Sequence, residues 1–464
     1  MPTPLEELRA IVGPRGWSDD PAELEPFLTE RRGAVRGSTA LMLAPKTVAE
    51  ASRIVSVCAR ERIGIVPQGG NTGLCGGAIP DASGTQVLLR MGRLNAVRAI
   101  DADNFAMTVE AGCILADVQA AARQAGLYFP LSLSPEGSCQ IGGNLSTNAG
   151  GINVLRYGTA RQQVLGLEVV LADGTIWDGL RALRKDTAGY DLKQLFLGSE
   201  GTLGIITAAT LALHPDPGPI TTAVVALDSA AAAVALLARM RADLADRIQA
   251  FELISDRCFR FVHRHIPDTA PPFDNAYPWY VLLDAAVGGG EERVAASIAA
   301  AIENGVAADA IVAKNSGEAE RLWRQRHSIS EAQRHEGASL KHDVAVPVSA
   351  LREFLERAGR LVGELQPGAR LVTFGHVGDG NLHYNVSQPR GADAAAFRAA
   401  GRTLTQAIYE LVRELGGTIS AEHGIGVLKK ADLATYRDEL ELGLMRRVKR
   451  ALDPLGILNP GKVI

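Results

Sequence analysis

Glycine is concentrated in a few short segments of this chain, and that concentration limits what the chain can fold into. The sequence has 49 glycines, and no fixed spacing relates the dense segments, which argues against a solenoid of short repeats. Glycines gathered in a few loops are typical of places where the backbone approaches a bound group closely. The dense segments are 69–77, 137–158, 198–204, 375–380 and 416–426.

The length of the chain favours two domains. A single compact domain rarely exceeds about 250–300 residues, and this chain has 464. Three prolines within five residues, Pro215, Pro217 and Pro219, mark the best boundary in the sequence. We expect the first domain to end at about residue 215.

Local patterns predict a mixture of helices and strands in both halves, which indicates an α+β fold. The capping box Thr47–Glu50 predicts a helix to about Arg62. Other predicted helices are 117–125, 229–244, 291–304, 317–335, 350–365 and 394–415. Predicted strands are 63–66, 87–89, 106–110, 164–171, 204–213, 251–254, 280–285, 338–347, 371–375 and 382–386. A hairpin turn is predicted at 172–175, and a docked loop at 453–464.

Charge and hydropathy exclude several classes of protein. The net charge is −4, so we do not expect a nucleic-acid partner. No run approaches the roughly 18–20 apolar residues of a membrane helix, so no transmembrane segment is expected. The first residues lack the features of a signal or transit peptide. Five scattered cysteines without a Cys-x-x-Cys pair indicate a reducing compartment, and we expect a cytoplasmic enzyme.

Two glycine-rich loops are candidates for binding a phosphate group. The dinucleotide fingerprint is absent, and the phosphate-loop-like 456–462 is excluded because no helix can follow it. Loops 67–77 and 132–151 remain, and successive small residues there would expose backbone N–H groups to an anion. Either loop alone could be an ordinary set of turns. Two such loops in one domain favour a diphosphate.

A cluster of histidines in the second half predicts a metal site. If Asp379-Gly380 forms a two-residue hairpin loop, His376 and His383 face each other with Cβ atoms about 4.5–5.5 Å apart. Glu422 and His423 add a carboxylate and an imidazole in a second glycine-bounded loop. Two histidines and a glutamate would leave an open position, as in catalytic zinc sites. Histidines hydrogen-bonded within a core are the alternative.

A possible carboxylate clamp lies between the predicted domain boundary and this cluster. Arg326 and Ser330 are four residues apart and therefore share a helix face. Lys341 follows on a predicted strand, where it alternates away from Leu340 and His342. Arginine binds carboxylates through two hydrogen bonds, and lysine adds a point charge. A solvated charged helix is the alternative.

The glycine loops resemble those of the FAD-dependent oxidoreductases of the vanillyl-alcohol oxidase / p-cresol methylhydroxylase type. Loop 67–77 resembles the pyrophosphate loop of that family, while 132–151, 198–206 and 459–462 resemble its other flavin-contacting segments. Asn71 stands in a loop where some members carry a FAD-tethering histidine, so non-covalent FAD is implied. The implied FAD-binding residues are Pro67, Gly69, Gly70, Asn71, Thr72, Gly73, Pro135, Gly137, Gly142, Gly143, Asn148, Gly150, Gly151, Glu200, Gly201, Gly204, Ile206 and Asn459.

The resemblance also implies a domain organisation. It implies a two-part FAD-binding domain at 1–215, an α+β cap with an antiparallel sheet at 216–420, and a C-terminal segment at 421–464 that returns to the flavin.

The motifs GHVGDGNLHYN (375–385) and AEHGIG (421–426) resemble the D-2-hydroxyacid dehydrogenase branch, and most closely D-2-hydroxyglutarate dehydrogenases. This implies His376, His383 and Glu422 as ligands of a divalent metal, expected to be Zn²⁺, and His423 as the catalytic base. The residues implied on the substrate side are Arg326, Ser330, Lys341, Asn385 and His376. Ser330 stands where that branch commonly has threonine.

We therefore expect FAD- and metal-dependent oxidation of a D-2-hydroxy acid, D-2-hydroxyglutarate or D-malate, to its 2-oxo acid. The resemblance suggests electron-transfer flavoprotein or a quinone as electron acceptor, and base rates favour a homodimer. A D-lactate or glycolate dehydrogenase is the nearest alternative. A zinc hydrolase and a non-catalytic flavin-binding subunit are alternatives from other classes.

Overall fold

The computed structural model describes residues 2–288 and 290–464, which form two compact units. The first unit comprises Met1–Gly151, Gly158–Asp216 and Glu422–Ile464. The second comprises Ile152–Tyr157 and Pro217–Ala421. No local pattern predicts that the short segment Ile152–Tyr157 packs with the second unit.

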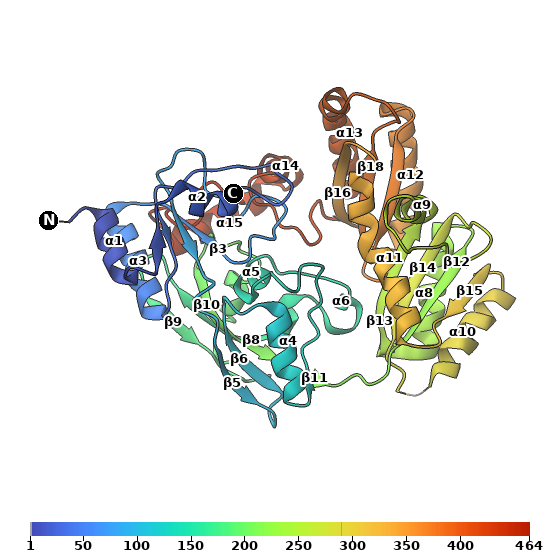
Figure 1. The fold of residues 1–464 in the computed structure, drawn as a ribbon, viewed down its shortest axis with the longest axis horizontal. Coiled ribbons are helices and arrows are strands. Elements are labelled where there is room, and N and C mark those ends of the chain that lie inside the picture. The colour runs from blue at the N-terminus through green and yellow to red at the C-terminus, as the bar shows by residue number, and fades with distance from the viewer. Residues whose placement is uncertain (1, 289) are drawn as a thin grey trace. The chain divides into compact units, whose positions relative to one another are not determined.

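A small sheet in the first unit carries the first glycine loop (Figure 1). Its strand order is β1-β2-β4-β3, and β2, β4 and β3 are parallel. Helix α3 follows as the capping box predicts, because the Thr47 hydroxyl accepts the Glu50 N–H at 3.1 Å. The elements are α1 (Pro4–Val12), β1 (Trp17–Ser18), α2 (Pro21–Leu24), β2 (Met42–Leu43), α3 (Val48–Glu61), β3 (Ile65–Gln68) and β4 (Val87–Arg90).

A five-stranded antiparallel sheet forms the other part of the first unit, in the order β5-β6-β10-β8-β9. The predicted turn at 172–175 joins β8 to β9, where Thr175 and Leu171 are hydrogen-bonded. The elements are β5 (Val97–Asp101), β6 (Ala106–Glu110), α4 (Leu115–Gln124), β7 (Leu127–Tyr128), α5 (Ile141–Ser146), β8 (Val164–Val170), β9 (Ile176–Gly179), α7 (Lys193–Phe196), β10 (Ile205–Ala212) and β11 (His214–Pro215).

The C-terminal segment completes the first unit. Its helices are α14 (Lys430–Tyr436) and α15 (Glu439–Leu452). The last residues dock on β3, as predicted for this loop, because the Asn459 N–H donates to the Ile65 carbonyl at 2.8 Å. Ile457 and Leu458 are buried beside it.

The second unit contains a seven-stranded antiparallel sheet in the order β15-β12-β14-β13-β17-β18-β16. Helix α9 packs with α11, α8 with α10, and α12 with α13. The sequence patterns do not predict α6, α9, β12 or β15. The elements are α6 (Val154–Tyr157), β12 (Thr221–Leu227), α8 (Ala230–Leu244), β13 (Ile248–Ser255), α9 (Asp256–His265), β14 (Trp279–Ala285), α10 (Glu291–Glu303), β15 (Asp309–Val312), α11 (Ser316–Arg334), β16 (Ser339–Ala345), α12 (Leu351–Leu365), β17 (Arg370–Gly375), β18 (Asn381–Ser387) and α13 (Ala394–Glu414).

The hairpin between β17 and β18 differs from the prediction. The loop spans five residues, 376–380, and His383 lies opposite Phe374 rather than His376. Gly375 has a φ of +151°, and a Cβ there would lie 2.6 Å from the Asn381 carbonyl oxygen. The chain therefore leaves the ladder at this glycine, before His376. The two-residue hairpin is wrong, although the rings of His376 and His383 are still only 5.7 Å apart.

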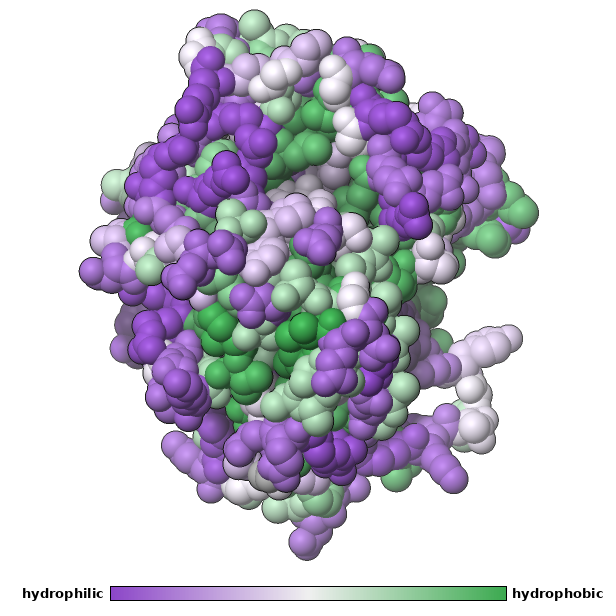
Figure 2. All heavy atoms as spheres, turned by 90° about the vertical axis from the view of Figure 1, so that its right-hand side faces the viewer, coloured by the Kyte–Doolittle hydropathy of each residue, from purple (hydrophilic) through white to green (hydrophobic). Residues whose placement is uncertain are grey.

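Hydrophilic side chains make up most of the face shown in Figure 2, with hydrophobic residues gathered in the hollows between them. None of the helices in residues 2–288 and 290–464 combines the length and the apolar character needed to cross a bilayer.

The environment of Asp284 on β14 leads us to expect that the free energy of unfolding depends on pH. Burial raises its pKa to about 6 from a usual 3.8, although Thr222 and Trp323 donate hydrogen bonds to the carboxylate. Because the pKa is higher in the folded protein, the cost of ionising Asp284 is absent below pH 3.8 and complete above about pH 6.

We expect Asp284→Asn to raise the free energy of unfolding by about 2 kcal/mol at pH 8 and to have little effect at pH 4. Urea unfolding across this pH range measures the difference. Asp246→Asn, on an exposed residue of the same unit, is the control. A gain that does not vary with pH would contradict the assignment.

Candidate functional site

The first unit contains a pocket formed by three glycine-rich segments that are far apart in the sequence. They are the loop after β3, the start of α5, and the segment before β10. His423, the predicted catalytic base, lines the same pocket. The predicted FAD-binding residues that line it are Pro67, Gly69, Gly70, Asn71, Thr72, Gly73, Gly142, Gly143, Glu200, Gly201, Gly204 and Ile206.

The pocket has features that suit a bound flavin nucleotide. A Cβ at Gly73 or at Gly143 would meet no protein atom within 4 Å, so the space beside these residues is open to a ligand. Gln68 and Gln140 also line the pocket, and their buried side-chain oxygens have no hydrogen-bond partner in the part of the chain that the structure describes. Buried polar atoms are normally paired, and a ligand with hydrogen-bond donors would pair these two.

Glu200 fixes the segment that carries His423. Its carboxylate accepts the backbone N–H groups of Ile425 (2.7 Å) and Gly426 (2.9 Å). Burial raises the pKa of Glu200, and the two hydrogen bonds oppose this rise by stabilising the charged form. Glu200 has a left-handed backbone with φ of +53°. Such strain in a non-glycine residue is characteristic of functional sites.

Six of the predicted FAD-binding residues do not line the pocket. Asn459 instead donates to the carbonyls of Gly77 (2.9 Å) and Glu200 (2.7 Å), which ties the C-terminal segment to the pocket wall. The Asn148 carboxamide oxygen accepts from Thr159 and from the Arg161 N–H. The other residues outside the pocket lining are Pro135, Gly137, Gly150 and Gly151.

The end of the second glycine loop supports Glu422 rather than the pocket wall. The Gly151 N–H donates to the Glu422 carboxylate at 2.8 Å, and a Cβ at Gly150 would lie 3.0 Å from the same oxygen. Glycine at both positions lets the backbone approach this carboxylate closely.

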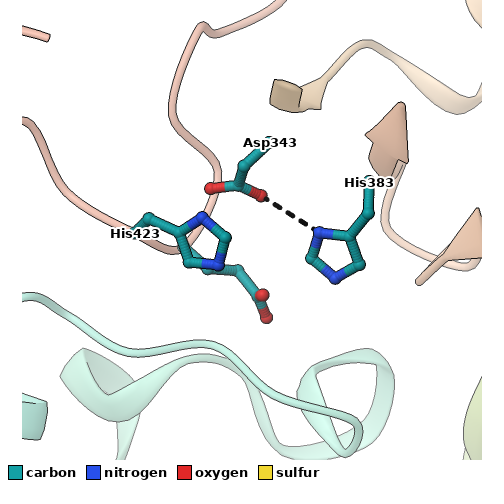
Figure 3. A group of neighbouring side chains, drawn as sticks. Asp343, His383 and His423 are labelled. Atoms are coloured by element: carbon teal, nitrogen blue, oxygen red, sulfur yellow. Dashed lines mark ion pairs between the residues drawn. The ribbon is translucent and has the colours of Figure 1, made fainter. Parts of the chain in front are cut away.

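In the second unit, each predicted metal-binding histidine has a carboxylate beside its Nδ1 atom. His383 on β18 lies opposite Asp343 on β16, and its Nδ1 is 3.7 Å from the Asp343 carboxylate (Figure 3). His376 Nδ1 is 2.5 Å from Glu252 Oε1. Carboxylates beside metal-binding histidines commonly fix the orientation of the ring. The sequence analysis missed both Asp343 and Glu252.

Glu252 also binds Arg326, the predicted clamp residue. The Arg326 guanidinium donates to Glu252 Oε2 at 2.8 and 2.6 Å. Burial alone would raise the pKa of Glu252, which is fully enclosed, but the charges of His376 and Arg326 outweigh burial and lower it to about 2. Glu252 is therefore a carboxylate at any physiological pH.

The other predicted substrate-side residues lie on neighbouring elements. Lys341 and Asn385 are opposite each other on β16 and β18, and both donate to the Gln333 side-chain oxygen, at 2.8 and 3.0 Å. Gln333 lies on α11, as does Ser330, which is exposed. The strand pairing thus brings Lys341 and Asn385 together.

The last residue of the second unit lies beside Asp343. Ala421 ends this unit, and its N–H donates to the Asp343 carbonyl at 3.4 Å. The predicted ligand Glu422 and the predicted base His423 follow Ala421 in the sequence and begin the last segment of the first unit.

Comparison with known protein families agrees with this geometry. Residues 216–463 match the family model described as FAD linked oxidases, C-terminal domain, and residues 39–179 match the one described as FAD binding domain. The first match covers more than half of the chain. This chain therefore belongs to the FAD-linked oxidases, which confirms the predicted family and its FAD-binding domain.

Individual relatives of this chain within the family are named D-2-hydroxyglutarate dehydrogenases. The chain is 39% identical over 447 residues to the D-2-hydroxyglutarate dehydrogenase of Xanthomonas citri pv. viticola, covering 96% of this chain and 93% of that protein. It is 36% identical over 461 residues to the mitochondrial D-2-hydroxyglutarate dehydrogenase of Arabidopsis thaliana, covering 98% of this chain and 80% of that protein.

A solved structure confirms the predicted fold. p-Cresol methylhydroxylase matches with a TM-score of 0.78 at 16% identity, covering 99% of this chain and 96% of that one.

The expected cytoplasmic location is wrong. The Arabidopsis relative is named mitochondrial, although the group also has a bacterial member. The reason is physical: scattered, unpaired cysteines report a reducing environment and do not identify the compartment.

The open space beside Gly143 predicts an effect on FAD binding. We expect Gly143→Ala to weaken FAD binding about tenfold or more, because the new methyl group occupies ligand space. Thermal unfolding of the apoprotein should change little. Gly359→Ala, at another glycine with no atom near a Cβ, is the control. FAD titration measures the effect, and equal affinity in both variants would contradict the pocket assignment.

Because Glu252 and Arg326 bind each other, we expect the effects of their substitutions on the free energy of unfolding to be coupled. We expect Glu252→Gln to lower the free energy of unfolding by about 3–5 kcal/mol, because it leaves a buried guanidinium without its anion. Arg326→Met should cost a similar amount. The double variant should cost much less than the sum of the two. Urea unfolding of the four proteins measures the coupling, and additive losses would show that the pair is not energetically linked.

Proposed function

We propose that this protein uses FAD and a divalent metal to oxidise a D-2-hydroxy acid, D-2-hydroxyglutarate or D-malate, to the corresponding 2-oxo acid. One observation carries the proposal: His423 lines the same pocket as the glycine-rich flavin loops. The names of the relatives support the substrate class. Electron-transfer flavoprotein or a quinone is the proposed acceptor of the electrons, and a homodimer is the proposed assembly.

His423 is the general base in this proposal. FAD, when bound, supplies a two-electron acceptor. The His423 imidazole takes the proton of the substrate hydroxyl while the α-carbon hydrogen departs with its bonding electrons. The 2-oxo acid forms as the C–O bond becomes a double bond. Glu200 supports this step by holding the backbone of Ile425 and Gly426, two and three residues beyond His423.

His376, His383 and Glu422 are the proposed metal ligands. The carboxylates of Glu252 and Asp343 lie beside the Nδ1 atoms of the two histidines, and the metal would bind at Nε2 of each ring. A mixed set of nitrogen and oxygen ligands suits Zn²⁺. The metal would act as a Lewis acid toward the substrate hydroxyl and favour loss of its proton.

Arg326, Ser330, Lys341 and Asn385 are the proposed substrate-binding residues. Lys341 and Asn385 share the Gln333 side chain, which positions an ammonium and a carboxamide side by side. A substrate carboxylate bound to this ammonium replaces a neutral partner with a charged one. Charge-assisted hydrogen bonds are roughly twice as strong as neutral ones.

A D-lactate or glycolate dehydrogenase is the second candidate. The observation that favours it is the double hydrogen bond of Arg326 to Glu252, which compensates the arginine charge. With the arginine charge compensated in this way, Lys341 is the proposed binding group for the single carboxylate of such a substrate.

His423→Ala should abolish most of the activity and leave FAD bound. We expect turnover to fall by about 10²–10⁴-fold, measured anaerobically as bleaching of the flavin by 2-hydroxyglutarate. His335→Ala, at an exposed histidine, should retain full activity. A His423→Ala enzyme that holds FAD and keeps its turnover would refute the assignment of the base.

Lys341→Met distinguishes the two candidate substrates. If the second carboxylate binds Lys341, KM for 2-hydroxyglutarate should rise about tenfold while KM for lactate changes little. Lys314→Met, at an exposed lysine, is the control. Equal increases for both substrates would favour the smaller acid.

A further inference from the structure

The sheet of the second unit opens between β13 and β17. These strands pair through only two residue pairs, Leu253–Gly375 and Ile254–Phe374, whereas β17 and β18 pair over five. After Ser255 the chain continues into α9. The Ser255 hydroxyl accepts a hydrogen bond from the Thr373 N–H at 3.2 Å. A cavity of about 470 Å³ lies at this opening, lined by residues of α9, β17, β18 and α12. All of them belong to the second unit.

Five arginines line this cavity. Arg257, Arg260 and Arg264 lie three and four residues apart, so they share one face of α9. Arg370 is the first residue of β17, and Arg390 follows the end of β18. Asp256 is the one acidic residue in the lining.

The acidic groups near the cavity do not balance this charge. Asp256 pairs with Arg260 at 2.5 Å. Glu336 pairs with Arg264 at 2.6 Å and with Arg370. Within residues 2–288 and 290–464, no carboxylate pairs with Arg257 or Arg390. Partial burial and the charges of Arg370 and Arg260 lower the pKa of Arg257, and an anion beside this guanidinium would oppose that shift by stabilising the charged form.

The rest of the lining includes Tyr384, a further hydrogen-bond donor, and apolar side chains such as Phe261. Tyr384 is 1% exposed, and its hydroxyl has no hydrogen-bond partner among the described residues. Burial raises its pKa above the usual range, so it stays protonated and able to donate. Phe261 lies under the Arg370 guanidinium, 5.3 Å from ring centre to carbon.

We propose that this opening in the sheet binds a small polyanion with phosphate or carboxylate groups, at a site separate from that of the substrate. The guanidinium groups of Arg257 and Arg390 would bind its charged oxygens through paired hydrogen bonds. The residues that line this cavity are distinct from every proposed substrate, metal and FAD residue. The proposal therefore does not depend on the reaction that the enzyme catalyses.

Calorimetric titration of the FAD-loaded protein tests this site, with pyrophosphate and citrate as separate probes. We expect saturable binding of at least one probe, weakened about tenfold or more in the Arg257→Gln/Arg390→Gln variant. A preference between the probes identifies the anionic group. The matched control is Arg398→Gln/Arg402→Gln, which removes the same charge from two exposed arginines of α13.

FAD content and turnover should stay unchanged in both double variants, which separates loss of this site from loss of fold or of catalysis. Absence of saturable binding in the unmodified protein would overturn the proposal. So would equal weakening in the cavity variant and the α13 control, because that result would mean diffuse attraction to a positive surface.

Discussion

The second unit depends on one buried carboxylate, that of Glu252. It is fully enclosed, and it binds an imidazole with one oxygen and a guanidinium with the other. Burying a charge is costly unless its partners are close and its hydrogen bonds are satisfied. Both conditions are met here, so Glu252 orients His376 and Arg326 together. Residues predicted for two different tasks, metal binding and substrate binding, share this anchor.

In the first unit, the main structural requirement is that the backbone lies close to a ligand. Glycines at the pocket leave open space, and Glu200 and Asn459 tie together the loop after β3, the segment before β10 and the segment that carries His423 through backbone groups. Asn71, Glu200 and Asn459 all have left-handed backbones. Each such residue costs of order 1–3 kcal/mol and persists only where the surroundings enforce it. For Glu200, the backbone N–H groups of Ile425 and Gly426 that donate to its carboxylate contribute to that enforcement.

Much of this arrangement could be predicted from sequence, because the signals are local. Glycine density located the pocket, and the Thr47 capping box located α3. Two things could not be predicted. The register of the β17–β18 hairpin depends on where Gly375 leaves the ladder, and a motif does not reveal that. Glu252 and Asp343 lie 124 and 40 residues before their histidines, so only the tertiary fold shows that they are partners.

A second carboxylate in the second unit, that of the half-buried Asp284, is affected by the charge of Glu252. Asp284 lies on β14, next to the strand of Glu252, and the charge of Glu252 contributes to its raised pKa. A sheet optimised for stability would not place two carboxylates so close in a low-dielectric interior. The Glu252 carboxylate is paired with the Arg326 guanidinium and the His376 imidazole, whereas Asp284 accepts hydrogen bonds from the neutral donors Thr222 and Trp323. Ionising Asp284 on β14 is therefore unfavourable in the folded protein, whereas Glu252 on β13 is held in its charged form beside the predicted site residues His376 and Arg326.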